Sequence, residues 1–310
     1  MDCAERAVQR RVSGVCRPLP SYINRVYEVE LEEGGFLVAK FYRPGRWTRA
    51  ALQDEHDFLL ELAGDEVPVI APLANPAGMT LHDENGMLYA IFSRMGGRPC
   101  DEPSQDEWRQ IGRLIGRIHQ TGARKPAANR LVLGPRHSSR THLAYLQESG
   151  AIPAEVERPY LDEARRLLER IEPMFDGIGT QRLHGDLHRM NLLWRPGEGF
   201  HAIDFDDMAM GPAIQDLWML LPDRLPAARF EFNLLLEGYE MFAEYDDAQT
   251  RLIEPLRAMR FLHYAAWCAR QKADEGRRLL HPEWGSADFW RRELADLRRQ
   301  ARDIEDLGRG

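Results

Sequence analysis

A run of helix- and strand-breaking residues, RMGGRP at positions 94–99, divides the chain into two parts of different character. Before this run, residues 26–31 and 36–42 are rich in β-branched and aromatic side chains on either side of a turn, which predicts an antiparallel hairpin. A second hairpin pattern follows near residues 80–92, and residues 48–63 carry apolar side chains at helical spacing. After the run, the patterns are almost all helical. The fold must therefore combine a small sheet with a large helical region.

The helical region shows apolar residues three to four apart in five segments, at residues 106–118, 154–175, 227–245, 255–274 and 286–305. Two short strand-like stretches interrupt them near residues 182–184 and 200–203. The sequence therefore predicts an α+β protein with two lobes. We expect residues 1–93 to form a small N-lobe, an antiparallel sheet with one helix. Residues 94–310 are expected to form a larger, mainly helical C-lobe beyond a hinge.

The composition of the 310 residues, 44% hydrophobic and 29% charged, is that of an ordinary globular protein. The formal net charge of −8 argues against a nucleic-acid or acidic-membrane partner, because phosphate surfaces attract basic proteins. No apolar run approaches the roughly 18 residues of a membrane span, and the charged start lacks the apolar core of a secretory signal. The four cysteines are scattered, which disfavours a zinc site or a disulfide framework. We expect a monomeric, cytoplasmic protein.

Two loops near the middle of the chain carry carboxylate and amide side chains, each after a short apolar strand. LHGDLHRMNLLW at residues 183–194 has Asp186 and Asn191 five apart after a short apolar strand, and HAIDFDD at residues 201–207 has Asp204 after another. Mg²⁺ prefers oxygen ligands, and an acceptor hydroxyl needs a carboxylate that takes its proton. Taken singly, such residues more often cap turns. Three of them in register favour one shared catalytic and metal site.

Lysine is rare in this chain. Only three of its 41 basic residues are lysines, and one of them, Lys40, lies on the second strand of the first predicted hairpin. A lysine at this place can reach the phosphates of a nucleotide and pair with a carboxylate of the following helix. Glu55 is the best candidate for that pair, and Glu61 is a poorer one. The alternative is a solvent-facing strand lysine, which the rarity of lysine disfavours.

The sequence HGDLHxxNLLW, with IDFDD downstream, resembles the aminoglycoside phosphotransferase and choline kinase-like superfamily, which shares the protein-kinase fold. The spacing is that of the kinase catalytic loop, H-x-D-x-x-x-x-N, followed by a metal-binding aspartate. Two features favour this superfamily over ordinary eukaryotic protein kinases. His188 stands where those kinases have a lysine, and Phe205-Asp206 replaces their Phe-Gly. The resemblance implies a bilobal, protein-kinase-like fold.

The resemblance also implies roles for individual residues. Asp186 is the expected proton acceptor. Asn191 and Asp204 are the expected Mg²⁺ ligands, so Asp204 would serve both catalysis and metal binding. ATP is the expected co-substrate, and Lys40 with Glu55 is expected to hold its phosphates.

The expected nucleotide-covering loop, SYINRVY at residues 21–27, contains no glycine. Phosphate contacts are therefore expected from side chains such as Ser21 and Asn24 as well as from backbone N–H groups. The adenine is expected against the hinge, where Ser93 and Met95 lie.

Four longer stretches resemble a group of bacterial stress-response serine/threonine protein kinases within the superfamily: SYINRVYEVE at 21–30, KFYRPGRWT at 40–48, GPAIQDLWMLL at 211–221 and IEPLRAMR at 253–260. This resemblance implies transfer of the γ-phosphate of ATP to protein serine or threonine, and it allows self-phosphorylation. The main alternative is a small-molecule kinase that acts on an amino alcohol, a sugar or an aminoglycoside. A nucleotide-binding scaffold without turnover is the second alternative. The glycine-free loop favours it and the intact catalytic set disfavours it.

The acidic residues beside the expected metal ligand leave two interpretations open. Asp206 and Asp207 either bind a second metal ion or hydrogen-bond within their own loop. Asp216 matches an aspartate with which the superfamily braces the catalytic loop, so we expect it to support that loop rather than take part in chemistry.

Overall fold

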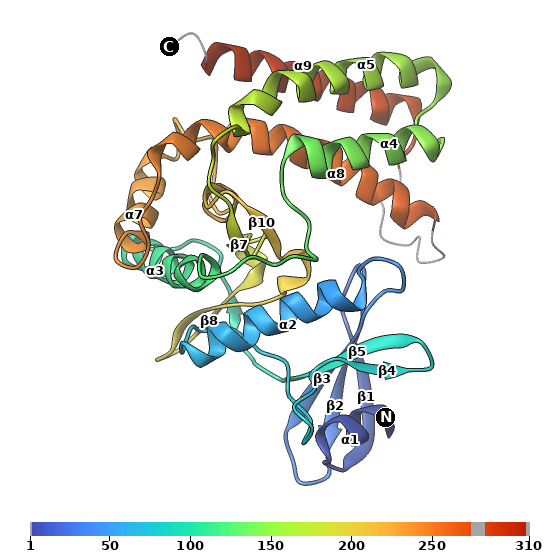
Figure 1. Ribbon diagram of the computed structural model, residues 1–310, viewed down its shortest axis with the longest axis vertical. Helices are drawn as coiled ribbons and strands as arrows, with labels where there is room; N and C mark the ends of the chain where they lie inside the picture. The colour runs from blue at the N-terminus through green and yellow to red at the C-terminus, as the bar shows by residue number, and fades with distance from the viewer. Residues whose placement is uncertain (1, 274–282, 308–310) are drawn as a thin grey trace. The chain divides into compact units, whose positions relative to one another are not determined.

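The computed structural model describes residues 2–273 and 283–307, which belong to two compact units (Figure 1). The first unit comprises Met1–Arg130, Gln181–Met210 and Asp216–Tyr245, and the second comprises Leu131–Thr180, Gly211–Gln215 and Asp246–Gly310. Within the described ranges, no helix has both the length and the apolar character needed to cross a membrane.

The first unit is built on a five-stranded antiparallel sheet with the strand order β1-β2-β3-β5-β4. Its strands are β1 (Val12–Leu19), β2 (Arg25–Leu31), β3 (Phe36–Phe41), β4 (His82–Glu84) and β5 (Met87–Ser93). The two predicted hairpins are confirmed as β2–β3 and β4–β5, each closed by a short turn.

Different helices cover the two faces of this sheet. α1 (Asp2–Val8) packs on one face, in a buried cluster that includes Ala39 of β3. α2 (Arg49–Gly64) packs on the other, in a cluster that includes Leu52. Successive side chains of a strand point to opposite faces, so Lys40, next to Ala39, points to the α2 side. The alternation of β3 thus directs the rare lysine away from the α1 cluster.

The remaining elements of the first unit carry the two loops that the sequence singles out. They are β6 (Arg98–Pro99), α3 (Gln105–Gly122), β7 (Gln181–Leu183), β8 (Leu192–Arg195), β9 (Gly199–Ala202) and α7 (Arg229–Tyr239). β6, β8 and β9 form an antiparallel sheet, and β7 pairs with β10 (Ala209–Gly211). The short helix α6 (Ile214–Trp218) follows β10.

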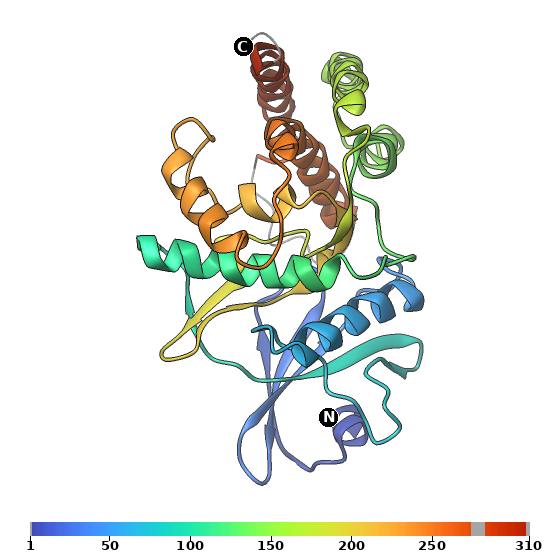
Figure 2. The same ribbon diagram turned by 60° about the vertical axis from the view of Figure 1, so that its left-hand side comes forward.

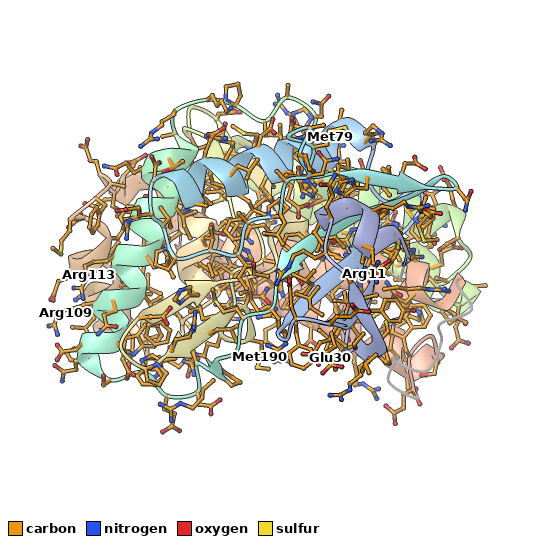
Figure 3. All side chains as sticks on the ribbon, turned by 90° about the horizontal axis from the view of Figure 1, so that it is seen from below. Arg11, Glu30, Met79, Arg109, Arg113 and Met190 are labelled. Atoms are coloured by element: carbon orange, nitrogen blue, oxygen red, sulfur yellow. The ribbon has the colours of Figure 1, made fainter. Side chains whose placement is uncertain are left out.

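Helices α3 and α7 lie against each other at backbone distance (Figures 1 and 2). Glycines allow this approach: a Cβ at Gly112 of α3 would lie 2.1 Å from the carbonyl oxygen of Leu235. A Cβ at Gly238 of α7 would lie 2.1 Å from the carbonyl oxygen of Arg109. The Arg109 side chain, labelled in Figure 3, adds a hydrogen bond from its Nε to Glu237 Oε2 (2.7 Å). The pairing of α3 with α7 therefore depends on residues without a side chain.

The second unit is helical in its described part. Its helices are α4 (Arg140–Glu148), α5 (Ala154–Ile171), α8 (Ile253–Ala273) and α9 (Ala287–Leu307). α5 and α9 lie side by side (Figure 1), and the fully buried rings of Tyr160 and Trp290 meet edge to face at 5.0 Å between them. Within α8, Arg257 Nε lies 3.2 Å from Glu254 Oε2, an ion pair inside one helix.

The predicted α+β class is confirmed, with an antiparallel sheet in the N-terminal part and helices in most of the rest. The predicted helix over residues 154–175 is too long: α5 ends at Ile171, and Glu172–Phe175 form a 3-10 turn. Pro173 explains the change, because proline has no N–H to continue the α-helical ladder. Residue 274, the expected end of another helix, lies outside the described ranges. The lobe boundary after residue 93 stays a prediction.

The sequence did not predict α1, β1 or α4. β1 is exposed along almost all its length and contains Gly14 and Pro18, so it has no alternating apolar pattern. α1 is a single short helix of seven residues, and α4 buries only two of its nine. Elements that bury so little apolar surface leave little periodicity in the sequence.

The close approach of α3 and α7 predicts that Gly238→Ala destabilises the protein. The added methyl group meets a helix backbone carbonyl, so the two helices must separate, at a cost of about 1–3 kcal/mol in the free energy of unfolding. Urea denaturation measures this change. Gly64→Ala is the matched control, because a Cβ there meets nothing within 4 Å. We expect it to leave stability unchanged or to raise it by about 0.5–1 kcal/mol. Equal stabilities of the two variants would refute the close-packing argument.

Candidate active site

The loop after β7 is held by a buried carboxylate, Asp216. Its two oxygens accept hydrogen bonds from the backbone N–H groups of His184 (2.8 Å) and Gly185 (2.9 Å). His119 Nε2, on α3, lies 3.0 Å from the same carboxylate, and His119 Nδ1 lies 3.1 Å from Tyr239 Oη of α7. Asp216 and His119 are fully buried, so this network is shielded from water. Asp216 thus connects the loop after β7 to helices α3 and α7, and it makes the bracing contacts that the sequence predicted for it.

His184 and Gly185 join this loop to the strand that carries Asp204. His184 Nε2 lies 2.8 Å from the carbonyl oxygen of Ile203, and its Nδ1 faces the N–H of Asp186 at 3.4 Å. A neutral imidazole protonated on Nε2 satisfies both contacts. Gly185 has a φ of 88°, and a Cβ there would lie 2.1 Å from the carbonyl oxygen of Asp207. Glycine is therefore required where the two loops touch.

Asp186 and Asn191 lie at the two ends of one short turn. Asn191 Nδ2 donates a hydrogen bond to the carbonyl oxygen of Asp186 (2.9 Å), so the amide oxygen points away from that carbonyl. The carbonyl oxygen of Asn191 accepts from the N–H of Ile203 (3.0 Å), which brings Asn191 beside the residue preceding Asp204. The Asp186 carboxylate is 28% exposed, and His188 Nε2 lies 3.5 Å from it. Met190, in the same turn, is 64% exposed (Figure 3).

Asp204 follows β9 in a left-handed backbone conformation, with φ 61° and ψ 69°. Such angles are uncommon for residues other than glycine and often mark functional sites. Its carboxylate is 57% exposed, and Lys40 Nζ donates to Oδ1 at 3.2 Å. The structure therefore brings Asp204, Asn191 and Asp186, which the sequence selected together by their spacing, into one chain of contacts with Lys40, which it selected by the rarity of lysine.

Lys40 is a buried cation shared by three carboxylates. Its Nζ lies 3.2 Å from Asp204, 3.3 Å from Asp206 and 3.9 Å from Glu55. Burial opposes the charge of Lys40, but Asp206, Asp204 and Glu55 outweigh it and hold its pKa well above the usual value. Burial raises the pKa of Glu55 to about 7, against the opposing effect of Lys40 and Arg130. Glu55 thus lies where the sequence expected it, and Glu61 pairs elsewhere.

Two arginines that the sequence did not single out complete the cluster. Arg130, fully buried, donates from Nε to the carbonyl oxygen of Met208 (2.6 Å) and from Nη2 to that of Asp206 (2.5 Å). Its Nη1 lies 3.6 Å from Glu55 Oε2, and its guanidinium lies 4.1 Å from the ring centre of Trp47. Arg130 therefore connects α2 with the backbone that follows Asp204.

Arg46, between β3 and α2, pairs with Asp206 at 3.2 Å and with Asp207 at 2.6 Å. Nearly every basic residue of this chain is arginine, so neither Arg46 nor Arg130 stands out by its type. Both arginines also lie far from Asp206 in the sequence, so no motif links them to it.

The expected nucleotide-side residues lie on the sheet of the first unit. Ser21 is exposed in the loop between β1 and β2, and Asn24, at the end of that loop, is 8% exposed. Ser93 is the last residue of β5, opposite Leu37 in the register. Met95 lies two residues further along the chain, and its carbonyl oxygen accepts a hydrogen bond from Arg94 Nη1 (2.5 Å). The nucleotide contacts of these residues stay predictions.

The donor set around Asp204 fits a hard divalent cation. One exposed carboxylate and one amide oxygen, from Asp204 and Asn191, are the oxygen ligands that Mg²⁺ takes in proteins, usually with phosphate oxygens and water completing the octahedron. The described residues contain no group of three or more His, Cys, Asp or Glu side chains arranged to hold a metal by themselves. A site with two protein ligands suits a metal that a nucleotide helps to bind.

Comparison with known proteins gives matches along most of the chain. Residues 15–252 match the model of a phosphotransferase enzyme family. Stress response kinase A of Shigella flexneri is 38% identical over 297 residues, which cover 96% of this chain and 90% of that protein. Serine/threonine protein kinase RdoA of Salmonella typhimurium (strain LT2) is 39% identical over 290 residues, 93% of this chain and 88% of that one.

The solved structures add a likeness of fold. The amicoumacin kinase hAmiN, in complex with AMP-PNP, Ca²⁺ and Ami, superposes with a TM-score of 0.74 over 99% of this chain and 92% of its own. Its sequence identity is 21%. The predicted kinase-like fold is therefore confirmed at the level of architecture.

The bracing role of Asp216 predicts that Asp216→Asn destabilises the protein. An amide group in this place presents an N–H donor to one of the two backbone N–H groups, which leaves a buried donor without an acceptor. We expect a loss of about 2–3 kcal/mol in the free energy of unfolding, measured by thermal or urea denaturation. Asp223→Asn, at an exposed aspartate of the same unit, is the control and should change stability by less than about 0.5 kcal/mol. A loss no larger than that of the control would mean that Asp216 does not support the loop.

Proposed function

The chain belongs to the phosphotransferase enzyme family, and we propose that it transfers the γ-phosphate of ATP to serine and threonine hydroxyls of protein substrates. The observation that carries this proposal is the chain of contacts that joins Lys40 to Asp204, the residue before Asp204 to Asn191, and Asn191 to Asp186. Phosphoryl transfer needs each of these groups: a cation for the phosphates, a carboxylate for the acceptor proton, and oxygen ligands for the metal. The relatives, of which one is named a serine/threonine protein kinase, favour protein over small-molecule acceptors.

In this proposal, Asp186 orients the acceptor hydroxyl and takes its proton as the oxygen attacks the γ-phosphorus. The bond from that phosphorus to the β–γ bridging oxygen breaks, and ADP leaves. Asn191 and Asp204 hold Mg²⁺, which when bound neutralises charge on the phosphates. Lys40 reaches the α- and β-phosphates, and Glu55 limits the directions in which its ammonium can point. Catalysis at such a site comes mainly from charged groups that are already in position before the reaction begins.

The nucleotide side of the site completes the proposal. Ser21 and Asn24 belong to the loop that covers the phosphates, and Ser93 and Met95 lie where the adenine meets the chain. Residues 1–93 would then act as the nucleotide-covering lobe and residues 94–310 as the lobe that carries the catalytic loop and the acceptor. We propose that the enzyme works as a monomer and, like its relatives by name, in a stress response.

Incubation with γ-labelled ATP and Mg²⁺, alone and with a generic basic protein, tests the proposal. Label on protein serine or threonine supports it, provided that the label disappears in Asp186→Asn. ATP consumption only after small metabolites are added would replace it with a small-molecule kinase. Nucleotide binding without ATP consumption across many acceptors would replace it with a scaffold.

Asp186→Asn is expected to bind nucleotide as the wild type does but to lose most of its turnover. The amide keeps the size of the side chain and cannot take a proton, and general-base catalysis contributes about 10²–10⁴-fold. Steady-state kinetics should therefore give a kcat lower by this factor, with a KM for ATP within about twofold of the wild type. Wild-type kcat in this variant would remove Asp186 from the mechanism.

Asp204→Ala is expected to weaken nucleotide binding in the presence of Mg²⁺ and to leave the weaker binding in EDTA unchanged, because the lost group is a metal ligand. Titration of a fluorescent ATP analogue under both conditions measures the difference. Lys40→Met is the matched comparison, because it removes a direct phosphate contact and should weaken binding with and without metal. A variant of Asp204 that responds to Mg²⁺ as the wild type does would contradict the assignment.

A further inference from the structure

Asp206 is the meeting point of three segments that come before residue 50 in the sequence. Asn24 Nδ2 donates to its Oδ1 at 3.1 Å, and Lys40 Nζ lies 3.3 Å from the same oxygen. Arg46 Nη1 lies 3.2 Å from its Oδ2. The side chain is only 7% exposed. One buried carboxylate thus contacts the β1–β2 loop, strand β3 and the β3–α2 connection.

Asn24 is the part of this arrangement that belongs to the nucleotide-covering loop. Both ends of its amide are used: Nδ2 donates to Asp206, and Oδ1 accepts from the N–H of Arg43 (3.1 Å). The loop is short, because β1 ends at Leu19 and β2 begins at Arg25. Tyr22, two residues earlier, is 65% exposed. The loop is therefore fixed at its inner end by a buried amide while its tip faces solvent.

The contacts of Asp206 argue against its use as a metal ligand. Both of its oxygens face N–H donors, and two of the three donors are cations. A divalent ion on this carboxylate would lie within a few ångströms of two positive charges in a poorly solvated place, where repulsion is strong. Asp204, two residues earlier, is by contrast 57% exposed.

We propose that Asp206 is a positioning residue that ties the nucleotide-covering loop, through Asn24, to the loop after β9 that carries Asp204, and that it does not bind metal itself. The inference rests on the proposed function, because it takes the β1–β2 loop to cover ATP. The tether holds the loop in place before the nucleotide arrives, so less conformational entropy is lost on binding. In a loop without glycine, this side-chain bond supplies the order that a nucleotide site needs.

Asn24→Ala tests the tether without changing any charge. We expect about tenfold weaker binding of a fluorescent ATP analogue, with and without Mg²⁺, because a hydrogen bond to a charged group is lost. The KM for ATP should rise by a similar factor while kcat stays within about twofold. In the ligand-free protein, chymotrypsin should cleave after Tyr22 several times faster than in the wild type, because local opening is easier.

Asn75→Ala is the matched control, since the Asn75 side chain also accepts hydrogen bonds, from the N–H groups of Ala77 and Met79, but in an exposed turn. It should leave nucleotide binding and cleavage after Tyr22 as in the wild type. Wild-type affinity together with wild-type cleavage in Asn24→Ala would overturn the proposal. The cleavage assay needs no nucleotide, so it remains informative if the wild type fails to bind ATP, a result that would refute the proposed function alone.

The variant Asp206→Asn distinguishes the proposed role of Asp206 in holding Asn24 from a role as a metal ligand. In a double-mutant cycle with Asn24→Ala, the losses in nucleotide affinity measured in EDTA should be less than additive, because both changes remove the same contact. Titration with Mn²⁺ in the presence of nucleotide should give the same number of bound ions as the wild type. Loss of a bound ion, with unchanged affinity in EDTA, would make Asp206 a metal ligand and overturn the inference. If Asp206→Asn does not fold, the Asn24→Ala results decide the question.

Discussion

The buried charge of Lys40 is the constraint on which the rest of the first unit depends. An ammonium group taken out of water is stable only beside opposite charges, and Lys40 has three carboxylates within 3.9 Å. One belongs to α2, and two belong to the loop after β9, more than 160 residues along the chain. The sheet, helix α2 and the loop after β9 must therefore meet at this lysine. The face of β3 that carries it is set by strand alternation, so sheet geometry and site chemistry are linked at one residue.

The loop after β7, which contains Asp186, is supported by a separate set of contacts. Asp216 binds two successive N–H groups of this loop and is itself held by His119, whose ring contacts Tyr239. His119 and Tyr239 belong to the two helices that approach closely through Gly112 and Gly238. A change in the distance between these helices would therefore move the loop. The packing of these two helices therefore helps to set the position of the loop that contains Asp186.

The sequence predicted the residues whose chemical type is rare or demanded by the reaction, and it missed those whose type is common. Lys40 stood out because lysine is scarce, and Asp186, Asn191 and Asp204 because their spacing suits a metal and a base. Arg130 lies fully buried in the cluster around Lys40, but it is one arginine among many. The hairpins and long helices were predictable from periodicity, whereas β1, exposed along most of its length, was not. The sequence does not indicate which distant segments meet in the fold, because the contacts of a buried polar side chain leave no periodic pattern.

The position of Glu55 follows from contacts along the whole of α2 rather than from Lys40 alone. Near its start, Asp54 accepts from the N–H of Asn129 (2.8 Å); further along, Glu61 accepts from Arg182 Nη2 (2.8 Å). Just beyond its end, Asp65 accepts from Thr121 Oγ1 (2.6 Å). Each partner belongs to α3, to the segment that follows it, or to β7. A rotation of α2 that withdrew Glu55 from Lys40 would have to break these bonds together and would leave the buried Arg182 without its carboxylate, which is costly. These contacts of α2 hold the lysine–glutamate pair in place before any nucleotide binds. The short β1–β2 loop is held by the single buried amide of Asn24, so it is the part of the site that can shift more easily.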